Sequence, residues 1–135
     1  RIVNKIHEKG EQSELAIKAI DHILLAAPKG CEQVAREFYA ETLGLKEIEK
    51  PEKLKKRGGV WFTFGNYEIH IGVEDPFSPA KKAHPAFVVE NLDGLKHHLQ
   101  AKGIEVIADY NRTDVKRFFI SDPFGNRLEF LEREK

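Results

Sequence analysis

"RFFISDPFGNRLEFLE" occupies residues 117–132, and its centre, Phe124-Gly125-Asn126, carries the strongest structural signal in the chain. The same three letters occur 60 residues earlier, in "FGNYEIH" at 64–70. In both places an apolar run precedes the glycine and a strand-like run follows it, which is typical of a turn between two strands. The repeat predicts that the chain contains the same structural unit twice.

The elements around each phrase recur in the same order: one strand, one helix and three strands. In the first copy the patterns predict a strand at 20–27, a helix at 31–45 that Gly44 ends, and strands at 46–50, 60–64 and 67–74. In the second copy they predict a strand at 84–90, a helix at 91–103 with Asn91 as its N-cap, and strands at 104–110, 116–121 and 126–132. A proline-containing linker lies between them at 74–83.

The predicted fold is α+β, with two tandem βαβββ modules that form a curved, mostly antiparallel eight-stranded sheet around a cleft. Module one covers 19–75 and module two covers 83–132, within a single domain at 19–135. Neither half has a second layer that could bury its sheet alone. Residues 1–18 are expected to be an N-terminal extension, and His7 within it is not expected to be a ligand.

Composition narrows the class of protein. The 135 residues have a formal net charge of zero, which argues against a nucleic-acid partner. No apolar run approaches the length of a membrane span, and the first residues are not expected to form a signal peptide.

The one cysteine, Cys31, excludes an internal disulfide and fits the cytoplasm, although its place at a helix start would lower the pKa of its thiol. The basic cluster "KLKKR" at 53–57 favours a solvated loop over an anion site.

Histidines and carboxylates recur at matching positions in the two modules. His22 and His84 lie 62 residues apart, each near the start of a first strand. Glu129 lies on the last strand of module two, and its counterpart in module one is Glu68 or His70, which share a strand face. Two imidazoles and a carboxylate around an open position suit a divalent metal ion. We therefore predict His22, His84, Glu129 and His70 (or Glu68) as metal ligands, with a preference for His70.

Four stretches of the chain resemble the vicinal oxygen chelate superfamily, over residues 19–132. This superfamily includes glyoxalase I, methylmalonyl-CoA epimerase, extradiol dioxygenases, fosfomycin-inactivating thiol transferases and metal-free bleomycin-binding proteins. The resemblance implies one divalent ion (Fe, Mn, Ni or Zn), held by the first and last strands of each module, which carry the ligand set above. The stretches are "IDHILLAA" (20–27), "FYAETLGL" (38–45), "HPAFVVENLDGLKHHLQAKGIEV" (84–106) and "RFFISDPFGNRLEFLE" (117–132).

The resemblance predicts a cytoplasmic, metal-dependent enzyme that acts on a small oxygen-bearing organic substrate. The chemistry would be that of an isomerase or lyase, or of a ring-cleaving dioxygenase, with Glu129 as the catalytic residue, or Glu68 in its place as base. The alternative is a metal-free resistance protein that binds a drug or metabolite. Because members of this size commonly pair, a homodimer is expected.

Four further side chains are candidates for binding the substrate. Arg117 and Arg127 lie on late strands of module two, where a guanidinium can hold a carboxylate or phosphate through two parallel hydrogen bonds. The competing role for each arginine is a surface salt bridge. Trp61 and Tyr110 could line the pocket, although core packing for the first and a core or rim position for the second are the competing roles.

Overall fold

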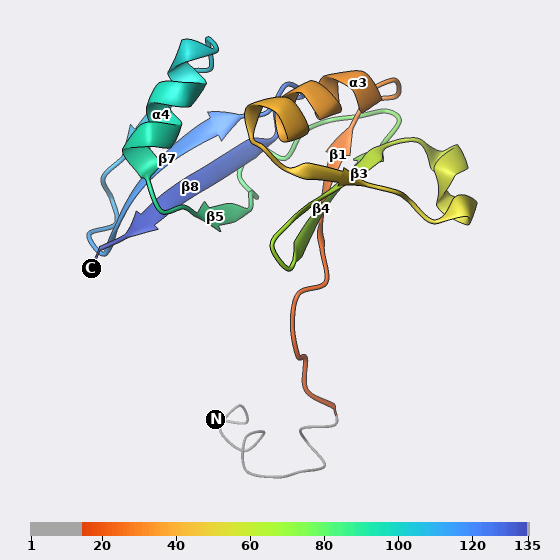
Figure 1. The fold of residues 1–135 in the computed structure, drawn as a ribbon, viewed down its shortest axis with the longest axis horizontal. Coiled ribbons are helices and arrows are strands. Elements are labelled where there is room, and N and C mark those ends of the chain that lie inside the picture. Colours follow the sequence, from red (N-terminus) through yellow and green to blue (C-terminus); the bar gives the residue numbers. More distant parts are fainter. Residues whose placement is uncertain (1–14, 135) are drawn as a thin grey trace.

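A computed structural model describes residues 15–134, and within them the two modules follow each other along the chain (Figure 1). His7 and most of the predicted extension lie outside the described residues. No helix of the described part has both the length and the apolar character needed to cross a bilayer. The elements are β1 (Ile23–Ala27), α3 (Glu32–Ala35), the π-helix η1 (Arg36–Thr42), β2 (Lys46–Ile48), the 3-10 helix η2 (Glu52–Arg57), β3 (Val60–Phe64), β4 (Tyr67–Val73), β5 (Ala86–Val88), α4 (Leu92–Ala101), β6 (Ile107–Asp109), β7 (Val115–Ser121) and β8 (Arg127–Arg133).

Each module forms its own four-stranded sheet, in the order β1-β4-β3-β2 and β5-β8-β7-β6. The outer strands β1 and β5 run parallel to β4 and β8, and the remaining pairs are antiparallel. The predicted tandem βαβββ fold is confirmed. The eight strands are divided between two sheets, and α3 and α4 lie on the same side of them (Figure 1).

Alternation along the strands separates a core face from an open face in each sheet. In β4, Ile69 and Ile71 are almost fully buried under the helices, and the intervening His70 points to the opposite face. In β8, Leu128 and Phe130 occupy the core face and Glu129 the open face. The predicted metal ligands on both last strands therefore lie on the face that the helices do not cover.

The first helix differs from the predicted one. Only Glu32–Ala35 is α-helical, and Arg36–Thr42 continues as a π-helix in which Leu43 N–H bonds the Phe38 carbonyl at 2.9 Å. Phe38 and Tyr39 of this turn lie in the core, whereas Val34 of α3 is 43% exposed. The second helix agrees with the prediction, and its N-cap Asn91 accepts a hydrogen bond from Gly94 N–H at 2.9 Å.

The two Phe-Gly-Asn phrases occupy the same corner of each module but form different turns. In module one, Gly65 and Asn66 alone connect β3 to β4, and Gly65 has a φ of 55° that favours glycine. In module two the connection from β7 to β8 has five residues, 122–126, with Gly125 at a φ of 92°. The longer loop begins with Asp122, which module one lacks at this corner.

Asp122 joins the two modules. Its buried carboxylate accepts the Tyr39 hydroxyl of module one at 2.6 Å and, within its own loop, the backbone N–H groups of Phe124 and Asn126 and the Asn126 side chain. The Asn126 amide also donates to the Ala26 carbonyl of β1 at 2.8 Å. Burial, and then the charge of Asp122, raise the pKa of Tyr39 well above its usual value, so its hydroxyl remains the donor.

The basic segment 53–57 is not an irregular loop. It forms the 3-10 helix η2, and Gly58 and Gly59 follow it with φ values of 76° and 86°. Glu32, at the start of α3, accepts a hydrogen bond from Gly59 N–H at 2.6 Å and so ties this segment to the first helix. This hydrogen bond is the main cause that holds the pKa of Glu32 below its usual value.

Tyr39→Phe removes one of the donors to a buried carboxylate, and hydrogen bonds to charged groups contribute about 1.5–3 kcal/mol. We expect the free energy of unfolding, measured by urea denaturation, to fall by about that amount. Tyr67→Phe is the matched control, since Tyr67 is 59% exposed, and should leave stability unchanged. Equal stability of the two variants would contradict the role given to the Tyr39–Asp122 bond.

Glu32→Gln tests the tie between η2 and α3 through its pH dependence. Because folding lowers the pKa of Glu32, its charge contributes stability above the unfolded-state pKa of about 4.3, and that contribution is lost as the pH falls through the lower folded pKa. The variant should be about 1 kcal/mol less stable than the native chain at pH 7, and this difference should be lost as the pH falls through the folded-state pKa of Glu32. Glu105→Gln, at an exposed site, is the control, and a pH-independent difference for Glu32→Gln would contradict this account.

Candidate functional site

Three aromatic rings stand side by side on the open face of module one. His70 stacks on Trp61 of β3 at 3.6 Å between ring centroids and on His22 at 4.1 Å, with interplanar angles of 3° and 13°. His70 Nε2 lies 2.8 Å from Glu68 Oε1, and His22 Nδ1 lies 2.9 Å from Asp21. His70 is buried, whereas His22 and Glu68 are open to solvent, so this row presents imidazole and carboxylate groups at a surface.

The strand register identifies the counterpart of Glu129. In module one, Leu24 of β1 pairs with His70, and in module two Ala86 of β5 pairs with Glu129. Leu24 follows His22 by two residues, and Ala86 follows His84 by two residues. His70 therefore occupies in module one the position that Glu129 occupies in module two, while Glu68 lies one position further along the same face.

The corresponding face of module two holds a carboxylate between an imidazole and a guanidinium. Glu129 is 4% exposed, with His84 Nε2 2.9 Å from one oxygen and Arg117 Nη1 3.2 Å from the other. Arg117 also bonds Asp109 through two of its nitrogens, at 3.1 and 3.3 Å. Burial acts to lower the pKa of Arg117, but its bonds to Asp109 and Glu129 outweigh that effect and raise it.

The predicted ligands thus form two groups, His22 with His70 and Glu68 in module one, and His84 with Glu129 in module two. Within residues 15–134 of one copy, no three His, Cys, Asp or Glu side chains are arranged to hold a metal ion. The donor types suit a divalent transition metal, yet the structure does not bring the two groups together in one chain.

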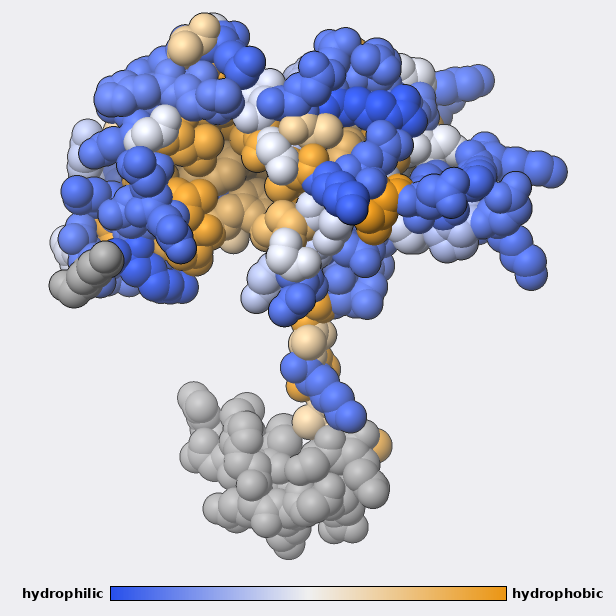
Figure 2. Space-filling view, in the orientation of Figure 1, coloured by the Kyte–Doolittle hydropathy of each residue, from blue (hydrophilic) through white to orange (hydrophobic). Residues whose placement is uncertain are grey.

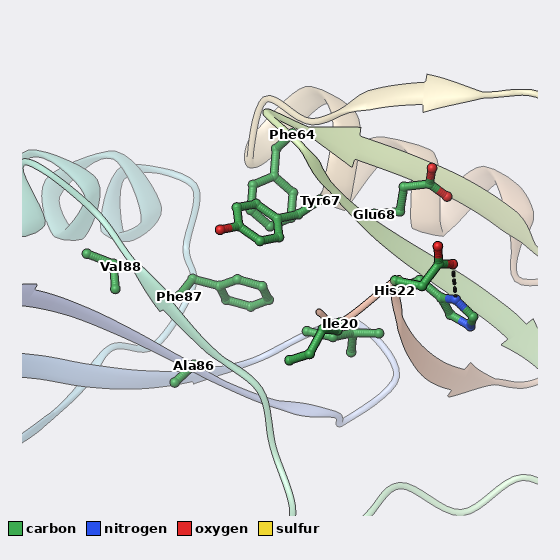
Figure 3. A pocket seen from close by; sticks show the side chains of 10 residues that line it. Ile20, His22, Phe64, Tyr67, Glu68, Ala86, Phe87 and Val88 are labelled. Carbon is green, nitrogen blue, oxygen red and sulfur yellow. Dashed lines mark hydrogen bonds and ion pairs between the residues drawn. The ribbon is translucent and has the colours of Figure 1, made fainter. Parts of the chain in front are cut away.

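An apolar hollow separates the two groups. Figure 2 shows hydrophobic surface gathered between the modules and bordered by hydrophilic side chains. A pocket of about 310 Å³ lies there, between β1, β4 and β5, and Figure 3 shows Phe64, Tyr67 and Phe87 at one side of it with His22 and Glu68 at the other. A smaller crevice of about 170 Å³ continues between Phe64, Phe87 and Phe130. These volumes suit the apolar part of a small organic molecule.

The predicted substrate-binding residues are dispersed. Trp61 lies beside His70, and Arg117 is held by two carboxylates, which was the competing role expected for it. Arg127 stacks over the Phe119 ring, 4.0 Å from its centroid, and forms no ion pair with the residues described here. Tyr110 is 87% exposed beside a different cavity, near Arg112, and is not part of either donor group.

Cys31 does not have the activated character that its place at a helix start suggested. It is 3% exposed, and burial, followed by the charge of Glu32, raises the pKa of its thiol. The thiol therefore belongs to the core.

Several residues of the site were not identified from the sequence. Asp21 bonds His22, Asp109 bonds Arg117, and Phe119 lies 5.2 Å from the His84 ring centroid. Asp109 pairs with Arg117 across β6 and β7, so exact knowledge of the strand register would have placed it on the open face. The pKa of Asp109 is held below its usual value, first by the Asn111 N–H and then by Arg117.

Comparisons with known proteins agree with this architecture. The family model described as "Glyoxalase/Bleomycin resistance protein/Dioxygenase superfamily" matches residues 19–130. A solved glyoxalase family protein from Bacillus anthracis is 61% identical, with a TM-score of 0.86 over 88% of this chain and 98% of that one. No curated protein sequence matches the chain.

Two more distant structures show the same fold. Lactoylglutathione lyase from Agrobacterium tumefaciens is 22% identical, with a TM-score of 0.67 over 86% of this chain and 94% of that one. TnmS3, an antibiotic binding protein from Streptomyces sp. CB03234, is 21% identical, with a TM-score of 0.67 over 87% of this chain and 100% of that one. With the family model covering most of the chain and two βαβββ modules in the structure, this protein belongs to the glyoxalase/bleomycin resistance protein/dioxygenase superfamily.

Proposed function

We propose that this protein is a metal-dependent enzyme of the glyoxalase type whose site forms between module one of one copy and module two of a second copy. The observation that carries the proposal is the division of the donors. His22 and His70 lie on one open sheet face, and His84 and Glu129 lie on the other. We infer that the two half-sites of one chain are completed by those of a second copy.

Uncovered apolar side chains on the same faces support this pairing. Leu24 shares its face with His70 and is 64% exposed, and Val88 and Ile107, on the face of Glu129, are 58% and 56% exposed. Burial of such side chains in a homodimer stabilises it by about 25 cal/mol per Å² of apolar surface. The same pairing would enclose the donors and exclude water from them. The single cysteine supports a cytoplasmic location.

The donor set defines the roles of the residues. His22, His70 (or Glu68), His84 and Glu129 would hold one Fe, Mn, Ni or Zn ion, which when bound supplies a Lewis acid for a substrate oxygen. We assign Glu129 as the base that would take a proton from a carbon beside the substrate oxygen, through Oε1, which lies 2.9 Å from His84 Nε2. Arg117 holds the other oxygen of Glu129 and so fixes the direction of the carboxylate.

The reaction we favour is isomerase or lyase chemistry on a small carbonyl compound, as the name of the lactoylglutathione lyase from Agrobacterium indicates for that protein. A ring-cleaving dioxygenase reaction needs the same donor set. The second candidate is a binding protein without chemistry, which the apolar hollow between the modules favours, and TnmS3 is named an antibiotic binding protein. Hemithioacetals, catechols and 2-oxo acids are the substrates to screen with metal-loaded protein.

Metal titration distinguishes the two candidates. The native protein should bind about one Co²⁺, Ni²⁺ or Zn²⁺ per chain, and His22→Ala, His84→Ala or Glu129→Ala should weaken binding by more than about 100-fold, measured by calorimetry. His70→Ala and Glu68→Ala, compared directly, identify the fourth ligand. His97→Ala, on the exposed side of α4, is the matched control. Absence of metal binding by the native protein would reject the enzyme and favour the binding protein.

A mixing experiment tests the second copy. A chain with His22→Ala and His70→Ala has an intact module two, and a chain with His84→Ala and Glu129→Ala has an intact module one. A heterodimer purified through two different tags should therefore regain one of its two metal sites, although neither parent binds metal. No recovery would show that each chain builds its site alone.

Arg117→Ala tests how Glu129 is held. The variant leaves the buried Glu129 carboxylate and Asp109 without their guanidinium, so the urea midpoint of the metal-free protein should fall. Adding Glu129→Gln should recover part of the loss, with a coupling energy of about 1 kcal/mol in a double-mutant cycle. Arg112→Ala breaks only the exposed pair with Asp114 and should leave the midpoint unchanged. Strict additivity would contradict a direct Arg117–Glu129 interaction.

A further inference from the structure

A cavity of about 470 Å³ lies on the open face of module one, and its two ends differ chemically. At one end lie His22, Glu68 and His70, with Trp61 beside them. The other end is formed by Lys50 and by η2 (Glu52–Arg57), which contributes Leu54 and Arg57. Its volume is in the range of small-molecule sites. We refer to this space as the module-one cleft.

The two carboxylates of the module-one cleft are both engaged with histidines. Asp21 lies 2.9 Å from His22, and Glu68 lies 2.8 Å from His70. They therefore form no ion pair with the cations at the other end of the cleft.

The cations at that other end have no carboxylate partner among residues 15–134. Neither Lys50 nor Arg57 forms an ion pair there, whereas the neighbouring Lys55 pairs with Glu49 and Glu52. The Lys50 ammonium donates to the Gly58 carbonyl, which holds it at the base of η2. Glu32, on which the charge of Lys50 also acts, lies outside the cleft lining, and its carboxylate is bound by Gly59 N–H.

We propose that the module-one cleft binds an organic anion, with its carboxylate or phosphate held by Lys50 and Arg57 and its oxygen-bearing reactive end toward His70. This assignment rests on the proposed function and specifies the substrate class for the same site. Arg57 can bind either group through two parallel hydrogen bonds, and Lys50 adds a point charge. Leu24 and Leu54 provide apolar wall between the charged end and the histidines.

Of the four cations at 53–57, Arg57 lines the module-one cleft. Lys53, Lys55 and Lys56 belong to the same 3-10 helix but do not line the cleft, and all three are exposed. A general solvated cluster would make its four cations equivalent. The cleft instead distinguishes Arg57 from the three lysines.

Trp61, the one tryptophan of the chain, lines the cleft and reports binding through its fluorescence. Phenyl phosphate, benzoate and the neutral benzyl alcohol are titrated into metal-free protein in EDTA. Phenyl phosphate or benzoate should bind, and whichever binds more tightly identifies the anionic group. Benzyl alcohol should bind at least about tenfold more weakly than the better anion, since charge-assisted hydrogen bonds contribute about 1.5–3 kcal/mol.

Arg57→Gln and Lys50→Met should each weaken binding of the better anion by about tenfold or more. Lys53→Gln is the matched control and should have the native affinity. Because Arg57 is exposed, its variant folds even if Lys50→Met disturbs the loop that Lys50 closes. Native affinity in Arg57→Gln, or equal binding of benzyl alcohol and the anions, would overturn the proposal.

The outcome is independent of the metal titration, because every measurement is made without metal. Loss of anion affinity in Arg57→Gln together with a failure to bind metal would retain the anion site and reject the metal-dependent enzyme. Metal binding by a protein whose anion affinity does not depend on Arg57 would retain the metal-dependent enzyme and reject the anion site.

Discussion

The fold depends on one buried carboxylate. Asp122 is 4% exposed and accepts hydrogen bonds from Tyr39, from two backbone N–H groups of its own loop and from the Asn126 amide. A buried charge is tolerated only when its oxygens are bonded in this way. Because one donor comes from the other module and Asn126 bonds the Ala26 carbonyl of β1, satisfying this charge also sets how the two halves meet. The contact ties β1 of module one to the loop that precedes β8 of module two.

Because side chains alternate along a strand, the residues that form the core and the residues that could bind a metal lie on opposite faces. Ile69 and Ile71 complete the core on one face of β4, and His70 between them belongs to the other face. β8 has the same alternation, with Glu129 on the open face between Leu128 and Phe130. Substitutions of these donor residues therefore do not replace a core side chain. The tolerance for different chemistries within this superfamily is consistent with such a division.

Much of the fold and part of the candidate site were predictable from local sequence patterns. The repeated turn, the apolar alternation and the Asn91 cap identified two βαβββ modules. They placed His22 and His84 near the starts of first strands and Glu129 on the last strand of module two. Which of His70 and Glu68 is the counterpart of Glu129 depended on the pairing of Leu24 with His70, which a sequence without its register does not contain. The π-helical turn after Ala35 was not predicted, because helical spacing assumes one hydrogen-bond pattern throughout. Contacts between distant segments, such as Tyr39 with Asp122, need the packed structure.

The unequal length of the two Phe-Gly-Asn turns has an evolutionary consequence. The longer loop at 122–126 bonds module one through Asp122 and Asn126, whereas the Gly65-Asn66 turn has no counterpart of Asp122. Phe64 and Tyr67, which flank this short turn, border the hollow between the modules. Descendants of this chain could therefore lengthen that hairpin into a lid that selects among ligands, while the union of the halves remains intact. A duplicated fold can change its specificity at the copy of a motif that does not hold the two modules together.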